Sequence, residues 1–457
     1  MTPLSLIKDK ILIQRVPAYG NKIFYSLGFL ALTSLSILIV TGLAMVFEGS
    51  KWWLQGQWGI YFRSVHLWSA QAFVFLIILH ALTVFLTSGF KAPRRLTWIL
   101  GSTVFFLALA EAEFGYDLRG DFSSQYRALQ GADFFNGAYL GKFINVLNQT
   151  QIYGLHIAIL PIIILTFLFF HYFLVKTLGI AKPYRPEFEY KIVRADHKKL
   201  FLRGGGLALL VLGLAFIFPS PLILPTTIKE VADENPSLFN QTLLAEFTKT
   251  SDTANYFDSI NPYQYDTREI YVTEPYGKYL SLSGGSNELS RFLSLSEDNQ
   301  KKDLAEAEAY FESGVKPDPQ NPLILVINSL GSMAQSGLYQ AAIDEENPGI
   351  NPTYSLRFLS DTGVLESEAA SLHITTEQWG MMREETKSMP LGAWWLSPIG
   401  VLNHSILAND PSGDRDGAEI LGSFALLFVL FPYLPWLNRI PEKLRIAELI
   451  WKTKSSD

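Results

Sequence analysis

Residues 66–80 read HLWSAQAFVFLIILH, a largely apolar stretch with a histidine at each end. Residues 156–171, HIAILPIIILTFLFFH, repeat the arrangement with an interval of fifteen instead of fourteen. Because a helix rises about 1.5 Å per residue, His66 and His80 are expected about 21 Å apart along one helix axis, near the two faces of a membrane core. Fourteen residues are also close to four turns, so both rings point the same way.

The composition indicates a membrane protein with one sizeable polar portion, since 49% of the 457 residues are hydrophobic and the mean hydropathy is positive. Six apolar stretches approach the ~20 residues that cross the hydrocarbon as a helix. They are Phe24–Phe47, Ser64–Ser88, Trp98–Gly115, Ile152–Leu174, Gly204–Leu224 and Ala418–Leu437. We therefore expect an all-α membrane protein: a four-helix transmembrane bundle, two further transmembrane helices and a large, mainly helical insert.

The net charge of −6 conceals a segregation along the chain. Residues 226–417 hold 12 Lys/Arg and 29 Asp/Glu, a local charge of −17, which leaves +11 for the rest. The basic residues gather before the first span and in the connections from the second to the third and from the fourth to the fifth. The positive-inside rule therefore predicts both termini in the cytoplasm and the acidic insert outside an inner or other energy-transducing membrane.

The chain contains no cysteine, which excludes disulfides, thiolate-bound clusters and thioether-attached haem within it. The first apolar stretch has 24 residues and no small-residue cleavage site after it. Because a signal-peptide core is shorter, we interpret this stretch as an uncleaved anchor.

The second and fourth spans run in the same direction, so their histidines match in depth. His66 pairs with His156 near the outer face, and His80 pairs with His171 near the inner face. An imidazole facing lipid is costly, and polar groups inside spans turn toward a cofactor, a partner or a cavity. One histidine alone would indicate ordinary hydrogen-bonded packing, whereas two depth-matched pairs indicate two stacked haems.

Small and basic residues follow the same depths. Gly28 and Gly42 on the first span, and Gly101 and Gly115 on the third, are fourteen residues apart and would let a flat ligand approach, although plain helix packing is the alternative. For the haem propionates the candidates are Arg63 at the outer end and Arg94, with its neighbours Lys91 and Arg95, at the inner end. Ordinary interfacial anchoring explains these basic residues equally well.

Several segments resemble the cytochrome b subunit of Rieske-type quinol-oxidising complexes, especially its plastid and cyanobacterial branch. They are VPAYGNKIFYSLG (16–28), TGLAMVF (41–47), RSVHLW (63–68), KAPRRLTW (91–98), FGY (114–116) and KTLGIAKP (176–183). The fifteen-residue interval from His156 to His171 is also like this branch. The resemblance covers about residues 10–185. It implies two non-covalent haems b, each held by two histidines, and a quinone site near each membrane face.

Beyond residue 185 the resemblance thins. GAWWLSPIGVL (392–402) stands in place of the PEWY segment at the family's outer quinol site, with Ala393 where the family has a proton-accepting glutamate. An interfacial tryptophan belt is the alternative. The family's third C-terminal span is missing, and residues 226–390 are foreign to the pattern.

Polar residues at two span ends are candidates for the quinone sites. Glu111 and Glu113 lie at the outer end of the third span, where the family is usually apolar, and we hypothesise that one of them accepts the quinol proton. Both simply reaching outer water is the alternative. At the inner face, Asp196 and His197 stand where the family binds quinone with a polar pair, although a solvated basic stretch has the same composition.

The expected organisation has six parts. They are an N-terminal amphipathic surface segment at 1–23, read as a helix; the di-haem bundle at 24–185; the fifth transmembrane helix at 186–225; a separately folding acidic insert at 226–390; the outer-site-like segment with the sixth helix at 391–438; and a cytoplasmic tail at 439–457. A flexible terminus is the alternative for the first part.

The leading functional hypothesis is the di-haem subunit of a quinol:cytochrome c or similar oxidoreductase, moving electrons across the membrane between quinone sites. The resemblance implies a Rieske iron-sulfur protein or a c-type cytochrome as partner, and a dimer within a larger complex. No nucleic-acid partner is expected. The acidic insert would steer a basic carrier, or serve only solubility. A haem relay without bifurcation, favoured by Ala393, and a non-catalytic scaffold subunit remain open alternatives.

Overall fold

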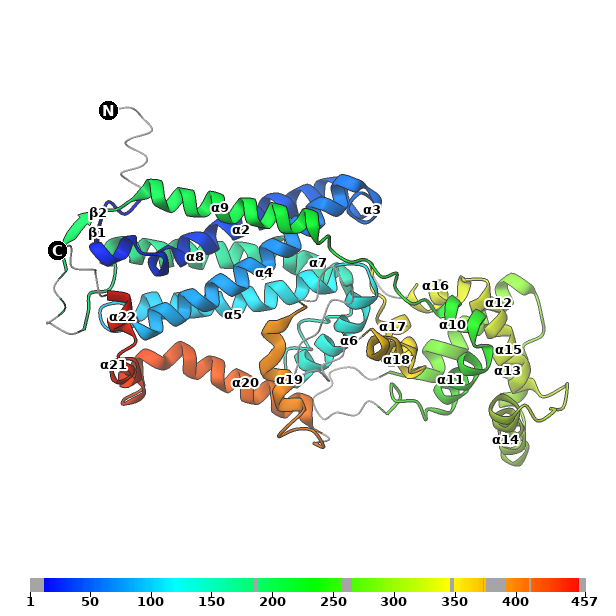
Figure 1. The fold of residues 1–457 in the computed structure, drawn as a ribbon. Coiled ribbons are helices and arrows are strands. Elements are labelled where there is room, and N and C mark those ends of the chain that lie inside the picture. The colour runs from blue at the N-terminus through cyan, green and yellow to red at the C-terminus, as the bar shows by residue number, and fades with distance from the viewer. Residues whose placement is uncertain are drawn as a thin grey trace.

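The structure is a computed structural model that describes residues 12–184, 188, 190–255, 265–345, 349–372, 374, 392–410 and 412–451. Four long helices form a bundle, two more lie against its sides, and a helical insert extends from one end (Figure 1). This arrangement confirms the all-α membrane fold. We call the end that carries the insert the insert end, and the opposite end, where β1 and α22 lie, the terminal end.

Six helices are long and apolar enough to cross a membrane, and they run at Ile23–Glu48, Gln57–Leu86, Arg95–Asp117, Gln149–Leu178, His197–Ile217 and Arg415–Tyr433. Each overlaps one of the six predicted spans, so their number and order are confirmed. The bundle consists of α2 (Leu27–Glu48), α4 (Gln57–Leu86), α5 (Arg95–Asp117) and α8 (Leu160–Leu178), the last preceded by α7 (Gln149–Gly154) and the π-turn η3 (Leu155–Ile159). The short helix α3 (Ser50–Gln55) joins α2 to α4.

The two remaining membrane helices flank the bundle. Helix α9 (His197–Ile217) packs against α2 and α4, and α20 (Gly413–Leu430) packs against α5 and α6. Both helices end earlier in the chain than the sequence predicted, since α9 ends at Ile217 and α20 at Leu430. Pro219 and Pro221 follow α9 and lack the backbone N–H that continues a helix, and Pro432 converts the end of α20 into the short turn η6 (Phe431–Tyr433).

The terminal end contains the sheet that the all-α reading missed. Strands β1 (Arg15–Pro17) and β2 (Ile192–Arg194) pair antiparallel, with Val16 opposite Val193. The helical interpretation of residues 1–23 is therefore wrong for the part described, where β1 is followed by η1 (Ala18–Asn21) and η2 (Ile23–Ser26). Residues 1–11 lie outside the described residues. Near this sheet the chain closes with η7 (Leu437–Arg439), α21 (Ile440–Leu444) and α22 (Ala447–Trp451); residues 452–457 of the predicted tail are not described.

The insert end is covered by residues 118–148, whose main element is α6 (Phe122–Gly137); we call this segment the cover. The insert contributes a series of short helices. They are α10 (Ile228–Glu234), α11 (Pro236–Thr248), the π-turn η4 (Glu269–Thr273), α12 (Glu274–Ser283), α13 (Glu288–Leu293), α14 (Glu297–Ser313), α15 (Pro322–Gln335), α16 (Leu338–Asp344), α17 (Thr353–Asp361) and α18 (Val364–Ser371).

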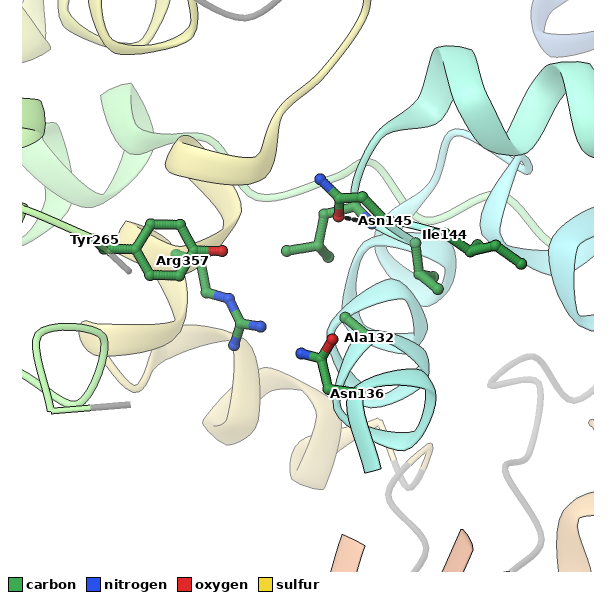
Figure 2. A pocket seen from close by; sticks show the side chains of 8 residues that line it. Ala132, Asn136, Ile144, Asn145, Tyr265 and Arg357 are labelled. Atoms are coloured by element: carbon green, nitrogen blue, oxygen red, sulfur yellow. Dashed lines mark hydrogen bonds between the residues drawn. The ribbon is translucent and has the colours of Figure 1, made fainter. Parts of the chain in front are cut away.

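From its Asn-Pro and Gly-Gly breakers we expected the insert to fold as a separate unit, but in the structure its hydrophobic core is continuous with that of the cover. One continuous hydrophobic core joins Phe122 and Leu129 of the cover to Phe239 and Phe358 of the insert. Polar contacts follow the same boundary, since Arg357 Nη2 lies 3.4 Å from Asp133 Oδ1. Figure 2 shows Tyr265 and Arg357 of the insert facing Asn136 and Asn145 of the cover across a crevice. The insert is thus packed onto the bundle through the cover.

Candidate functional site

The four histidines form two pairs inside the bundle. The ring centres of His66 on α4 and His156 in η3 are 6.3 Å apart, and those of His80 on α4 and His171 on α8 are 6.4 Å apart. Two metal–imidazole bonds of about 2 Å, with roughly 1 Å more from each nitrogen to its ring centre, give a separation near 6 Å. Each pair therefore has the spacing that one metal ion between two imidazoles requires.

Each histidine ring lies against one of the four predicted glycines. A Cβ atom added to Gly28 or Gly42 would lie 3.2 Å or 3.3 Å from Cε1 of His80 or His66. The same atom added to the α5 glycines would come closer still: Gly101 to His171 at 2.8 Å, and Gly115 to His156 at 2.9 Å. The glycines thus let α2 and α5, the two helices without ligands, pack closely against the rings. The role in admitting a flat ligand that we predicted for them stays a prediction.

Hydrogen bonds orient three of the rings. Nδ1 of His66 lies 2.9 Å from Thr41 Oγ1, and Nδ1 of His171 lies 2.9 Å from the main-chain oxygen of Thr97. Nδ1 of His156 lies 3.2 Å from the main-chain oxygen of Glu111 and 3.0 Å from its Oε1 atom. With Nδ1 engaged in this way, Nε2 is the nitrogen left to bind a metal.

The π-turn explains the unequal histidine intervals. A π-turn holds one residue more than an α-helical turn. His156 lies inside η3 (Leu155–Ile159), and Pro161, which has no backbone N–H, begins the α-helix that follows. The extra residue between His156 and His171 is therefore absorbed locally, and both rings still meet partners that are fourteen residues apart on α4.

The two arginines singled out from the sequence contact protein groups. Arg63 Nη2 donates to Asp121 Oδ2 at 2.9 Å and to the Pro221 carbonyl at 3.0 Å, next to a second ion pair from Arg119 to the same carboxylate. Arg94 donates to the carbonyls of Leu178, Gly179 and Ile180 at the C-terminal end of α8. Each arginine lies at the end of the bundle where it was predicted, and each stabilises an adjacent segment of the same chain through these contacts.

A buried acid–base cluster joins α5 to the cover. Arg127 Nη2 lies 2.5 Å and 2.6 Å from the two carboxylate oxygens of Glu113, and its guanidinium stacks on the Tyr116 ring. Burial lowers the pKa of Arg127, but the charges of Glu113, Tyr116 and Asp117 outweigh this effect and leave that pKa above its ordinary value. Asp117 is buried beside this pair.

Sequence reasoning missed the residues that hold the 392–396 segment. Gln71 Nε2 donates to Tyr116 Oη at 2.9 Å and to the Gly392 carbonyl at 3.2 Å, while Trp394 Nε1 donates to Gln71 Oε1 at 2.8 Å. Ala393 is fully buried in a cluster with Tyr116 and Trp395. The segment therefore packs against α4 and α5, and Gln71 joins it to both.

The residues predicted for an inner quinone site cap a helix. Asp196 Oδ1 accepts from the Lys199 backbone N–H at the start of α9, and His197 Nε2 lies 2.9 Å from the Ile13 carbonyl. Both are therefore at the terminal end of the molecule, next to β2.

Comparisons with known proteins bear on a part of the chain that includes His80, His156 and His171. A family model described as cytochrome b(N-terminal)/b6/petB matches residues 71–226. Proteins named cytochrome b6 from Synechococcus elongatus and Euglena gracilis are 31% and 32% identical to the chain over 203 residues, covering 39% of this chain and 94% of each relative. The chain belongs to the cytochrome b family. A solved structure described as a hyperthermophilic respiratory Complex III has a TM-score of 0.40 and 17% identity, covering 79% of this chain and 97% of that chain.

As a member of the cytochrome b family, the chain is a multi-pass membrane protein of electron transport, and the family implies haem b and interaction with quinone. The residues present fit a haem: opposed imidazoles at bonding separation lie in apolar spans, next to glycines that let α2 and α5 pack closely against the rings. The match to the family model ends at residue 226, so the insert and α20 lie beyond it.

Proposed function

We propose that this chain is the di-haem subunit of a quinol:cytochrome c or similar oxidoreductase, carrying electrons across the membrane between two quinone sites. His66 and His156 would hold the outer haem b, and His80 and His171 the inner one. The observation that carries the proposal is the pair of imidazole separations, 6.3 Å and 6.4 Å, at the two depths of one bundle.

The chain contributes binding, orientation and tuning. When bound, haem b supplies reversible one-electron transfer at iron. Contacts with Thr41, Thr97 and Glu111 engage the Nδ1 atoms of three ligands, which would leave the Nε2 atoms of these rings to bind the haem iron. The spans around the pairs are apolar, and the α5 glycines let α5 pack closely against His156 and His171.

An outer quinone site is proposed next to residues 392–396. Gln71, Tyr116 and Trp394 form a hydrogen-bonded wall there, and Glu113 is the carboxylate of the cluster with Arg127. We keep the hypothesis that Glu111 or Glu113 accepts the quinol proton, because Ala393 offers no carboxylate. Replacing both with glutamine tests it: unchanged quinol-driven haem reduction would exclude this role.

An inner quinone site is proposed near Asp196 and His197 at the terminal end. Its support is positional, since both residues begin α9 on the side where the His80–His171 pair lies. A His197→Ala variant should lose oxidation of the inner haem by quinone while keeping its haem. Because His197 also binds the Ile13 carbonyl, His197→Asn, which retains a polar group, is the matched control.

The orientation and partners are proposed from charge. Basic connections at the terminal end would place it in the cytoplasm and the acidic insert outside, in an inner or other energy-transducing membrane. A Rieske iron-sulfur protein or a c-type cytochrome would approach the insert end, and the subunit would act as a dimer within a larger complex. A one-signed insert surface would raise encounter rates with a basic carrier.

A relay without electron bifurcation is the second candidate, and a specific observation favours it. Ala393 is fully buried against Tyr116, so the 392–396 segment brings no proton-accepting side chain to the pocket. If quinol reduces the haems at the same rate with and without a Rieske partner, the relay is correct and bifurcation is not.

Haem stoichiometry tests the central proposal. The purified chain should contain two haems b, His156→Ala should lose the outer one, and His171→Ala the inner one. A reduced-minus-oxidised spectrum together with total haem per chain measures this. Protein that folds without haem would leave only a scaffold role, and one haem per chain would refute the two-site arrangement.

A further inference from the structure

The two histidines on α8 and its π-turn make equivalent contacts with α5, with one difference. His171 meets the main-chain oxygen of Thr97, four residues before Gly101, and His156 meets the main-chain oxygen of Glu111, four residues before Gly115. The backbone contact is therefore repeated at both depths. Only the outer position adds a carboxylate, which lies 3.0 Å from the same Nδ1 atom.

The carboxylate of Glu111 is held at the ring in a partly enclosed setting. Its side chain is 19% exposed, and that of His156 is 20% exposed. In the part of the chain that the structure describes, Oε1 contacts the ring, and the buried Oε2 atom has no hydrogen-bond partner. The charge is therefore directed at His156, whereas the neighbouring Glu113 is directed at Arg127.

We propose that Glu111 is a positioning residue that tunes the outer haem through His156, lowering the reduction potential of its iron relative to the inner haem. A metal-binding histidine that donates its second N–H to a carboxylate becomes a stronger donor, which favours the oxidised metal. At the inner pair, the neutral Thr97 carbonyl supplies a weaker acceptor. Axial-ligand hydrogen bonding is one of the levers by which proteins set haem potentials.

This inference deepens the proposed function and rests on it. An outer haem of lower potential passes its electron to the inner haem in the favourable direction, from the insert end to the terminal end. The side chain of Glu111 would thus give a direction to electron transfer between two sites that share one fourteen-residue backbone repeat. It also gives Glu111 a task separate from quinol proton acceptance, which leaves Glu113 for that hypothesis.

Redox titration of the purified full-length chain, followed by its haem absorbance, tests the inference. Glu111→Gln keeps an oxygen near Nδ1 without the charge, and Glu111→Thr installs the side chain found at Thr97. We expect both variants to raise the reduction potential of one haem by about 59 mV, which is a tenfold change in its one-electron reduction equilibrium. The potential of the other haem should stay unchanged. Glu113→Gln, which removes a charge two residues away that is paired with Arg127, is the control and should cause a much smaller shift.

The shifted haem is identified independently. Thr41 contacts His66, the other ligand proposed for the outer haem, so Thr41→Val should change the low-temperature paramagnetic resonance signal of the same haem that Glu111→Gln shifts. Two haems with unshifted potentials, or equal shifts in Glu111→Gln and Glu113→Gln, would overturn the inference while leaving the di-haem proposal intact. Absence of haem would instead refute the proposed function itself.

Discussion

The insert-end and terminal-end histidine pairs share a backbone frame and differ in their surroundings. In each pair a histidine of α4 faces a second histidine, which comes from η3 in one pair and from α8 in the other. One glycine from α2 and one from α5 pack against the two rings. At the insert end the side chains of Thr41 and Glu111 reach the rings, and at the equivalent inner positions the residues are Leu27 and Thr97. Helical periodicity therefore fixes where the histidines and glycines lie, whereas the side chains next to the rings determine the hydrogen bonds and charge at each pair.

The enclosure of the two ends differs as well. The cover, the 392–396 segment and the insert close the insert end with a continuous core. The terminal end is closed by the small sheet and by Tyr19, Ile450 and Trp451. Different segments therefore enclose the two histidine pairs. We expect that unfolding of the cover and the insert would affect the insert-end pair and leave the terminal-end pair unchanged.

The largest effect is expected from filling the space beside a histidine. Gly101→Ala and Gly115→Ala place a Cβ 2.8 Å and 2.9 Å from a ring, so the neighbouring histidine must move. Overpacking of this kind costs about 1–3 kcal/mol, which corresponds to a loss of about five- to 150-fold in affinity for the nearby haem. Haem content and spectra of the purified variants measure it, with only one haem weakened in each.

Two sets of variants bound this result. Gly28→Ala and Gly42→Ala, where the contact would be 3.2 Å and 3.3 Å, should have smaller effects. Gly213→Ala on α9, where nothing lies within 4 Å of the added atom, controls for the ~1 kcal/mol gain in helix propensity and should retain both haems. Equal haem loss in Gly101→Ala and Gly213→Ala would show that the ring contacts are not what matters.

A smaller effect, a slower reduction of the haems by quinol, is expected from a change at the proposed outer quinone site. Gln71→Leu removes the hydrogen bonds to Tyr116, Gly392 and Trp394 and leaves buried polar groups unsatisfied, at about 1–3 kcal/mol. Quinol-driven reduction of the haems should slow about tenfold while haem content is unchanged. Stopped-flow absorbance measures the rate. Gln57→Leu, at an exposed position fourteen residues earlier on α4, is the matched control, and an equal loss in both variants would contradict a role for the 392–396 segment.

Periodic features were predictable from the sequence. The six spans, the two histidine pairs and the supporting glycines all follow from hydropathy and from intervals of fourteen, because a helix converts spacing along the chain into direction and depth. The interval of fifteen, with Pro161 inside it, was the available signal for the π-turn. Its meaning became clear only when His156 was found inside that turn.

Contacts between distant segments were not predictable in this way. Gln71 meets Gly392 and Trp394 more than 300 positions away, and no local period marks that meeting. The shared core of the cover and the insert was missed for the same reason, since Asn-Pro and Gly-Gly breakers report local turns and not the surface on which a segment packs. The pairing of β1 with β2 likewise joins three-residue segments that are too short to show alternation.

The smallest effect is expected from pH, which should change the stability of the insert end and not that of the terminal end. In the insert, burial and the adjacent Asp361 raise the pKa of Glu246 to about 10, well above its value in an unfolded chain, and burial also raises the pKa of Asp361. The folded insert therefore holds a proton that the unfolded insert releases above about pH 4.5. The contribution of this proton to the stability of the insert is greatest below that pH and declines toward pH 10, by at most about 1.4 kcal/mol per pH unit.

Thermal melts of the detergent-solubilised full-length chain at pH 6 and pH 8 measure this dependence. The insert and the cover, which share one core, should unfold together at a lower temperature at pH 8 than at pH 6. The outer haem spectrum should change at this transition while the inner spectrum does not. Glu246→Gln removes the titrating group and should flatten the dependence, whereas Asp266→Asn should not, because Lys249 lowers the pKa of Asp266 and that group titrates below this range. If both haem spectra changed together at the insert transition, the cover would have to act on the whole bundle, and the independence of the two ends would be wrong.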